Sequence, residues 1–595
     1  MITQNRYDLA DDLRYEGLST DPKPTENVFP NSLFKELDTG NVYYYDANTS
    51  AWAKIGGYPI SLDGTKENYD KTMKEWFKAN GVNAVTAKGL TELVERWYKT
   101  IREEWTGGVE FAQPDQSSVS TGTKTRDNSD LSCTPSTAST KNTDDYEGLP
   151  LFAITNCNFV YDNEAKRPVI TALEGITGNY DNNDPEKLTG VLQMSGFYYQ
   201  NETPLKYERG VCAYYDSSFD KCMPYPESVE VDGSLREWVL HAKYPNKVVD
   251  NKYTSFAGGI PTAWESENKE EDLDVNAGGL CGGTLADLTF LKMMYEIKYA
   301  SMTADNNLQG CVNYNYQYCV ALGEEDVKRV LLTSAQAANI IEGSSLIIGT
   351  YDGSSKDRNT ATNYNISGNG GCRVLSKETV TVDGTSYVAL NLDLAENITT
   401  VGDGTEASGN TLVSTWHYAG GYCDSVLGND GSPINPANGA EPAMLQGIVY
   451  SVGGYEVLDD AILSQDAENY YVYVADAISK HSKNSIANYE LEGTCPKIAA
   501  ADAWQYIKKE TLSENGFLFP SLVGGSSSTY HRDGFYQNGT NTASGLREYL
   551  SFGSLYNGPA GGGLSIVGGS YALSNAFWNI VSRLSCNGNR GEWTA

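Results

Sequence analysis

The chain of 595 residues is 40% hydrophobic and far exceeds the roughly 250 to 300 residues at which one core stops growing, so we expect several domains. Lys plus Arg number 44 against 77 Asp plus Glu, and the net charge of -33 argues against binding to nucleic acid or anionic membranes. No apolar run of about 18 residues occurs, so no membrane insertion is expected. The acidic surface either keeps the protein soluble or includes carboxylates that collect a divalent cation such as calcium; no other cofactor is indicated.

The opening residues MITQNRYDLADDLRYEG lack the basic and then apolar stretches of a signal peptide, so we expect synthesis in a cytoplasm. The eleven cysteines are an odd number and form no Cys-x-x-Cys pair. That spacing favours neither a zinc site nor a disulfide framework. We expect most of these cysteines to be buried small hydrophobes.

Short strands separated by turn residues mark the first segment, residues 1–60. Strands are predicted at 34–37, 41–45 and 51–55, which indicates a small β module. Between residues 61 and 112, apolar side chains recur at three- and four-residue steps on both sides of Gly81. This spacing predicts a helical hairpin.

A Ser-, Thr- and Asp-rich stretch at 113–147 predicts a linker, and a central α+β domain follows at 148–483. A long helix is predicted at 284–299, and Thr333 with Gln336 forms the pattern of a capping box. Residues 352–442 are rich in Gly, Asn, Thr and Ser and are expected to form a β insertion, with a hairpin turning at Asp383-Gly384. The fold class expected overall is multidomain α+β.

The C-terminal segment, 484–595, combines paired glycines, isolated polar residues and many aromatic residues. Glycine permits positive φ and close backbone approach, and the polar residues are expected to bind backbone carbonyls and hold the loops. The residues that we assign to this scaffold are Gly524, Gly525, Arg547, Gly553, Asn557, Gly558, Asn579 and Arg583.

The same segment resembles a known family through short blocks in a fixed order. The blocks are Phe519-Pro520, Gly524-Gly525-Ser526-Ser527, Asp533-Gly534, Gly545-x-Arg547, Gly553-Ser554-Leu555-Tyr556-Asn557-Gly558 and Asn579-Ile580-x-x-Arg583-Leu584. In this order they resemble C-type-lectin-fold phage proteins that retroelements diversify, the group of the major tropism determinant. The resemblance implies a C-type lectin-like fold for 484–595, whose core can also draw strands from the central region, with a variable ligand-binding face between constant anchors.

The candidate contact residues on that face are Tyr549, Phe552, Tyr556, Pro559, Ile566, Gly568, Tyr571, Ala576 and Phe577. Large rings give contact area at low entropy cost, as in antibody paratopes. For each of these residues the alternative is a place in the core.

The resemblance implies a bacteriophage virion protein of a tail or head fibre, on the virion surface, that binds a host cell-surface protein or glycan. The N-terminal stretch FKELDTGNVYYYDANTSAWAKI resembles a small module found near the N-terminal ends of phage virion proteins, which implies docking onto other virion proteins. A homotrimer is expected because fibre proteins of this kind trimerise. One alternative is a decoration or assembly protein without receptor binding.

A second alternative is a glycan depolymerase that uses paired carboxylates, for which Asp459-Asp460 and Glu270-Glu271-Asp272 are the available runs. Such runs are usually solvated faces. Only four histidines occur, without an HExxH spacing, and no Walker A sequence is present. We therefore assign no catalytic residue and do not expect an enzyme.

Overall fold

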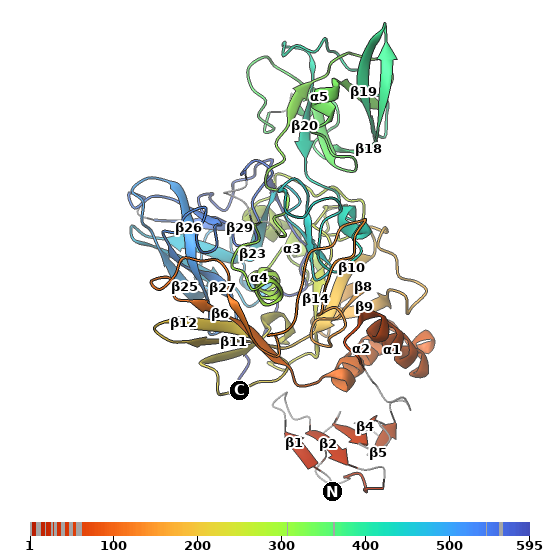
Figure 1. Cartoon of the computed structure of the whole chain (residues 1–595), viewed down its shortest axis with the longest axis vertical. Helices are drawn as coiled ribbons and strands as arrows, with labels where there is room; N and C mark the ends of the chain where they lie inside the picture. Colours follow the sequence, from red (N-terminus) through yellow and green to blue (C-terminus); the bar gives the residue numbers. More distant parts are fainter. Residues whose placement is uncertain are drawn as a thin grey trace.

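The computed structural model describes residues 62–595 except 306, 361–362, 543, 559–562 and 595, and within the first 61 residues it describes 3–6, 13–17, 20–24, 28, 32–36, 42–46 and 51–54. This part of the chain is α+β, with many strands and few helices. Figure 1 shows a large body between a small N-terminal sheet and a lobe, which lie at opposite ends of the long axis.

The N-terminal sheet confirms the predicted β module. Its strands, in spatial order, are β1 (Thr3–Arg6), β2 (Leu13–Gly17), β3 (Leu33–Glu36), β4 (Val42–Asp46) and β5 (Ala51–Lys54). The last three coincide with the predicted strands, whereas β2 and β3 pair in parallel. Trp52 packs edge-on against Tyr15, Phe34 and Tyr45, so one indole organises the small core.

The helical hairpin is confirmed as α1 (Lys66–Ala79) and α2 (Ala87–Ile101), joined by the 3-10 turn η1 (Val82–Ala84). Threonine side chains cap both helices, and Tyr69 and Trp97 meet between them. The predicted end of this unit at 112 was wrong. Residues 106–112 form the strand β6 (Thr106–Ala112), whose glycines and single valine carry no helical periodicity.

The prediction of a linker at 113–147 was also wrong. This stretch contains β7 (Thr123–Arg126), which pairs with β6, and its Asn128 donates to the carbonyls of Gly108 and Ile297. The hydroxyl of Tyr146 in turn donates to Asn128 at 2.6 Å. Polar side chains that bond to backbone groups let the segment pack without large apolar residues, which composition alone does not reveal.

The body contains three larger sheets. One has the order β14-β10-β8-β9, built from β8 (Ile154–Asp162), β9 (Arg167–Leu173), β10 (Leu188–Met194) and β14 (Trp238–Ala242). The second has the order β13-β11-β12-β6-β7, with β11 (Phe197–Glu202), β12 (Lys206–Cys212) and β13 (Lys221–Pro224). A short pair, β21 (Ala443–Leu445) and β22 (Ile448–Tyr450), lies beside them.

The third sheet has nine strands in the order β25-β24-β23-β29-β30-β28-β26-β27, with β31 beside β23. Its members are β23 (Tyr455–Gln465), β24 (Asn469–Val474), β25 (Glu490–Pro496), β26 (Ala503–Leu512), β27 (Leu518–Val523), β28 (Gly534–Gln537), β29 (Gly545–Ser551), β30 (Val567–Gly568) and β31 (Ile580–Val581). The predicted boundary at 484 therefore cuts through this C-terminal sheet, since β23 and β24 precede it.

The predicted β insertion is present as the lobe at the top of Figure 1, but its bounds differ from 352–442. The lobe consists of β15 (Gln317–Cys319), β16 (Arg329–Leu332), α5 (Ser334–Ala337), β17 (Ser345–Thr350), β18 (Cys372–Val382), β19 (Thr385–Leu392) and β20 (Thr411–Trp416). Its early strands are apolar like those of the body, so a boundary drawn from composition falls too late. The predicted capping box at Thr333 and the turn at Asp383-Gly384, with φ of 48° and 77°, are confirmed.

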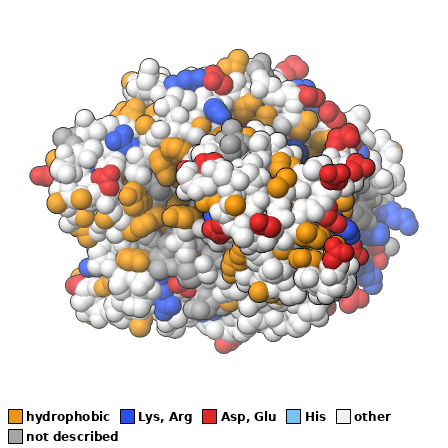
Figure 2. Space-filling model, turned by 90° about the horizontal axis from the view of Figure 1, so that it is seen from above, with side chains coloured by type: hydrophobic (Ala, Val, Ile, Leu, Met, Phe, Trp, Pro, Cys, Tyr) orange, Lys and Arg blue, Asp and Glu red, His pale blue; other side chains and the backbone are white. Residues whose placement is uncertain are grey.

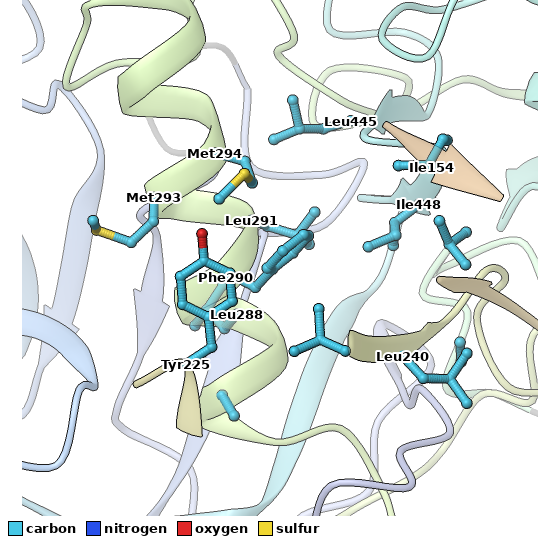
Figure 3. Close-up of a cluster of buried hydrophobic side chains, with 14 of the residues drawn as sticks. Ile154, Tyr225, Leu240, Leu288, Phe290, Leu291, Met293, Met294, Leu445 and Ile448 are labelled. Atoms are coloured by element: carbon cyan, nitrogen blue, oxygen red, sulfur yellow. The ribbon is translucent and has the colours of Figure 1, made fainter. Parts of the chain in front are cut away.

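The predicted long helix is α4 (Leu285–Tyr299), and it runs through the centre of the body. The side chain of Thr284 caps it together with Asp287. Figure 3 shows its apolar side chains, among them Phe290 and Met294, surrounded by side chains from several sheets. Residues 285–298 are all buried, so this helix has no solvent-facing side except at its end.

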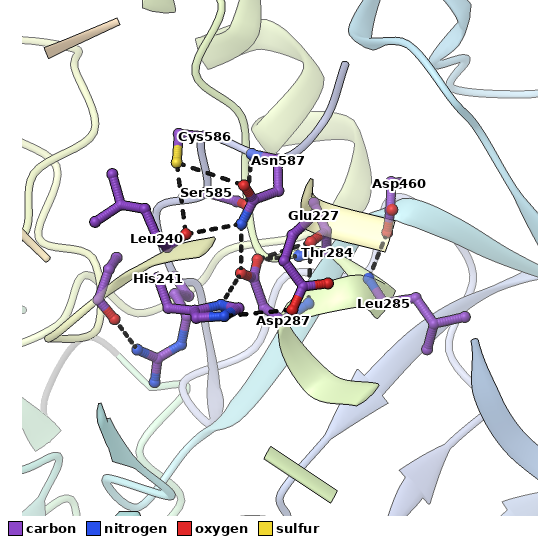
Figure 4. Close-up of polar contacts among 12 residues, drawn as sticks. Glu227, Leu240, His241, Thr284, Leu285, Asp287, Asp460, Ser585, Cys586 and Asn587 are labelled. Carbon is purple, nitrogen blue, oxygen red and sulfur yellow. Dashed lines mark hydrogen bonds and ion pairs between the residues drawn. The ribbon is translucent and has the colours of Figure 1, made fainter. Parts of the chain in front are cut away.

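The N-terminal end of α4 sits in a buried polar network, drawn in Figure 4. Asp287 contacts His241 Nδ1 at 2.7 Å and accepts from Thr284 at 2.7 Å and from Asn587 at 2.9 Å. Glu227 lies 3.5 Å from the other ring nitrogen of His241. Burial alone lowers the pKa of His241, but the two carboxylates outweigh it and raise the pKa to about 9.

This raised pKa predicts a pH dependence of stability. Protonated His241 stabilises the fold fully below its ordinary pKa of 6.5, and this contribution is lost as the pH rises through about 9. The contribution is about 3 kcal/mol. We expect His241→Gln to flatten the decline of the free energy of unfolding between about pH 7 and pH 9, measured by urea denaturation.

The matched control is His417→Gln. His417 is equally buried, bonds to the Trp578 carbonyl at 2.7 Å, and burial lowers its pKa to about 4. This variant should lose stability by the same amount at both pH values. An unchanged decline in the His241 variant would contradict the assignment.

Candidate functional site

Arg583 is the strongest anchor of the predicted C-terminal scaffold. Its guanidinium lies 2.8 Å from Glu456 and donates to the carbonyls of Ala242 at 3.0 Å and Val449 at 2.5 Å. The predicted role, holding backbone carbonyls, is confirmed for this residue. These bonds fix the chain after β31 to β14, β22 and β23.

The other polar anchors act more locally. Asn557 donates to the Tyr455 hydroxyl at 2.6 Å. Arg547 donates to the side chain of Asn538 and to the carbonyl of Leu546, both at 2.8 Å. Asn579 contributes its backbone carbonyl, which accepts from the Tyr455 amide at 2.8 Å. Tyr455, the first residue of β23, therefore links two of the predicted anchors, Asn557 and Asn579, to this strand.

The predicted scaffold glycines serve the backbone as expected at three positions. Gly524, Gly553 and Gly558 have φ of 102°, 79° and 76°, a region that other residues rarely occupy. Gly525 has no such φ, but a Cβ there would lie 3.1 Å from the ring of Tyr530.

Four predicted contact residues lie inside the protein, which corrects their assignment to a surface. Tyr549, Phe552 and Ile566 are at most 2% exposed. Gly568 is buried in β30, where a Cβ would lie 3.2 Å from the Cβ of Leu550. They occupy the middle of the nine-stranded sheet or its flanks, where large side chains fill the core. Their alternative, a place in the core, is the observed one.

The remaining predicted contact residues are accessible where they are described. Tyr556 is 68% exposed, and Tyr571, Ala576 and Phe577 are half-buried in the loop between β30 and β31. The rings of Tyr571 and Phe577 lie 5.1 Å apart. Pro559 lies outside the described residues.

Two aromatic residues that the sequence analysis missed join this loop. Trp504 on β26 and Tyr536 on β28 pair across the sheet, with ring centroids 5.1 Å apart, and both are half-buried. Trp504 packs on the same apolar cluster as Tyr571 and Phe577. The sequence signal that could have identified Trp504 is the alternation of aromatic and polar residues in β26. We call Trp504, Tyr536, Tyr571 and Phe577 the aromatic patch.

The aromatic patch consists of half-buried aromatic rings. The face shown in Figure 2 carries its hydrophobic side chains in several groups among polar and charged ones. The side chains of all four histidines are at most 3% exposed, so none of them faces a ligand at the surface. All eleven cysteines are free and ten are buried, as expected.

No protein-family model matches the chain, and no curated protein is significantly similar to it. The likeness to lectin-fold phage proteins therefore depends on the short C-terminal blocks. Among the described residues, no helix has both the length and the apolar character needed to cross a bilayer.

The split between core and surface positions can be measured. Ile566→Ala should lower the free energy of unfolding by about 2 to 5 kcal/mol, because it leaves a cavity in a closed cluster. Tyr556→Ala should change it by no more than about 0.5 kcal/mol. Equal effects in urea denaturation would show that the two sites have the same environment.

Proposed function

We propose that the chain is a bacteriophage virion surface protein whose C-terminal region, of the C-type lectin-like kind, binds a host cell-surface protein or glycan. The observation that carries the proposal is the aromatic patch. Its four half-buried rings come from β26, β28 and the loop before β31. Trp504, Tyr571 and Phe577 pack on one apolar cluster, and Tyr536 pairs with Trp504. The lectin-like assignment itself depends on the C-terminal sequence blocks.

Rigidity makes such a patch useful. Tyr and Trp have few rotatable bonds, so an ordered ring loses little entropy when a partner covers it. The loop that carries Tyr571 and Phe577 ends at β31, and Arg583 just beyond this strand is held by its ion pair with Glu456. Binding energy is therefore not spent on ordering the loop.

The placement of the candidate variable residues also supports the proposal. Tyr571, Ala576 and Phe577 lie in one loop, whereas the predicted anchors Gly553 and Arg583 are buried. Substitutions in that loop would change the contact surface and leave the sheet intact. This separation is what a diversified binding face requires.

Two alternative functions, a glycan depolymerase and a decoration protein, make different demands on the structure. Asp459, Asp460 and Glu270 are fully buried, so a polysaccharide does not reach them and they do not support a depolymerase. A decoration protein would cover the aromatic patch with a virion neighbour. In our proposal the N-terminal sheet, at the far end from the lobe in Figure 1, makes the virion contact, and the protein assembles as a homotrimer.

We expect Phe577→Ala and Tyr571→Ala to weaken binding to host cells by roughly 30-fold each, which corresponds to about 2 kcal/mol. The reason is the loss of a central ring from a desolvated contact. The measurement titrates fluorescently labelled full-length protein onto intact cells of the bacterium that the phage infects, and onto non-host strains.

The control is Leu205→Ala, which removes an apolar side chain that is 63% exposed in the hairpin between β11 and β12. This variant should bind like the wild type. Wild-type binding by both patch variants, with all proteins folded, would refute the proposal. Immunogold labelling that finds the C-terminal region covered inside the particle would favour the decoration protein.

A further inference from the structure

A group of buried carboxylates lies beneath the loop of the aromatic patch. It gathers residues from α3 (Glu267–Ala277), from the segment before it, and from β23 and β29. The buried members are Glu265, Glu267, Glu270, Asp459 and Glu548, and the largely buried side chain of Asp274 and the half-buried Glu271 complete the cluster. The acidic runs at 270–272 and 459–460 resemble solvated faces in sequence, but this prediction is wrong for Glu270, Asp459 and Asp460, which are buried.

Two members of this cluster and the neighbouring His481 have the spacing of metal ligands. One donor atom each of Asp274, Asp459 and His481 lies within 4.8 Å of the others. His481 Nδ1 is 3.1 Å from Asp274 and 3.5 Å from Asp459. The second oxygen of Asp459 accepts from the Gly282 amide at 2.8 Å, which fixes the orientation of this carboxylate.

Glu270 points into the same place without a partner. Its side chain is fully buried, and neither of its oxygens accepts a hydrogen bond from the part of the chain that the structure describes. A Cβ built on Gly282 would lie 2.6 Å from Glu270 Oε2 and 2.8 Å from the Cβ of Asp459. Gly282 thus leaves room for the Glu270 carboxylate beside Asp459. Glu267 also has two buried oxygens without a partner.

The protein supplies too little positive charge for this cluster. His481 contacts two of its carboxylates, whereas Lys483 pairs with Asp272 at the surface and Arg590 pairs with Asp460. A buried, unpaired carboxylate costs several kcal/mol, so the cluster needs either protons or a cation.

We infer that Glu270, Asp274 and Asp459 bind a divalent metal ion. Carboxylate oxygens are the ligands that Ca²⁺ and Mn²⁺ prefer, and a ring nitrogen of His481 in the shell would favour Mn²⁺ or Zn²⁺. One divalent ion would neutralise the charge of two carboxylates and give the unpaired oxygens of Glu270 a positively charged partner. The ion would join α3 to β23 across the interior.

The site also touches the framework of the aromatic patch. The amide of Asn268 on α3 donates to the Leu573 carbonyl at 2.9 Å, and the Glu548 amide donates to the Tyr571 carbonyl at 3.0 Å. An ion that fixes α3 therefore steadies the loop that carries Tyr571. This consequence depends on the proposed function, whereas metal binding does not.

The test uses the full-length protein, stripped with EDTA and dialysed, and adds CaCl₂, MnCl₂ or ZnCl₂ separately. We expect about one equivalent of ion to remain after gel filtration, measured by elemental analysis, and the Tm to rise by several degrees. Preference for Ca²⁺ indicates an oxygen-only shell, and preference for Mn²⁺ or Zn²⁺ places His481 in it. These measurements need no host cells, so their outcome is independent of the receptor-binding test.

Glu270→Gln and Asp459→Asn should weaken the affinity for the ion by roughly tenfold or more. The metal-free Glu270→Gln protein should be at least as stable as the metal-free wild type, because a repelling charge is gone. Asp272→Asn is the matched control on the same helix, since its side chain is 72% exposed. It should bind the ion like the wild type.

Failure of all three ions to bind, with a Tm that EDTA and added metal leave unchanged, would overturn the inference and leave the carboxylates protonated. Equal loss of affinity in the Asp272 control would place the ion at the surface instead.

Discussion

The burial of α4 is the constraint on which the rest of the body depends. This helix carries Asp287, Lys292, Glu296 and Lys298 into the interior, and each has a charged partner from a different part of the chain. The partners are His241 on β14, Glu510 on β26, Arg209 on β12, and Asp144 with Asp430 in loops. Removing one partner of a buried pair costs about 3 to 5 kcal/mol, so each of the three larger sheets of the body has to meet the helix in register. Apolar burial drives the assembly, and the charges select one arrangement of it.

This arrangement explains why central and C-terminal parts are not independent. A single apolar cluster extends from the helical hairpin to Leu584 and Cys586, and β23 and β24 complete the C-terminal sheet. Lys292 and Arg209 both reach Glu510 on β26, the strand that also carries Trp504 of the aromatic patch. The surface proposed to bind a host is therefore braced by the central helix. The lobe has an apolar cluster of its own, but its Ile347 and Trp416 also pack in one cluster with Tyr244 and Val449 of the body. The described part of the N-terminal sheet has a separate small cluster.

What the sequence predicted correctly was local. The long helix at 284–299 and the capping box of Thr333 with Gln336 follow from local patterns. The turn at Asp383-Gly384 closes a hairpin, and the three N-terminal strands follow from alternation and turn residues within a few positions. The misses concern partners distant in the chain. The buried side chain of Asn128 donates to the carbonyl of Ile297, which is 169 residues away along the chain. Asp459 comes close to Asp274 and His481 only in the folded state. Composition classes both stretches as solvated, because it counts polar groups without their partners.

For the same reason, the sequence does not separate the candidate contact residues that are buried from those that are exposed. Aromatic residues among glycines look alike in sequence, yet β29 and β30 pass through the sheet interior while the following loop returns to the surface. A cavity at Ile566 costs about 2 to 5 kcal/mol, which is a large share of the roughly 5 to 15 kcal/mol by which a typical protein is stable. A change at an exposed ring costs about 0.5 kcal/mol or less. A binding face that tolerates many sequences therefore has to use positions such as Tyr571, Ala576 and Phe577, and the interior ring of Tyr549 has to stay constant for the patch to keep its support.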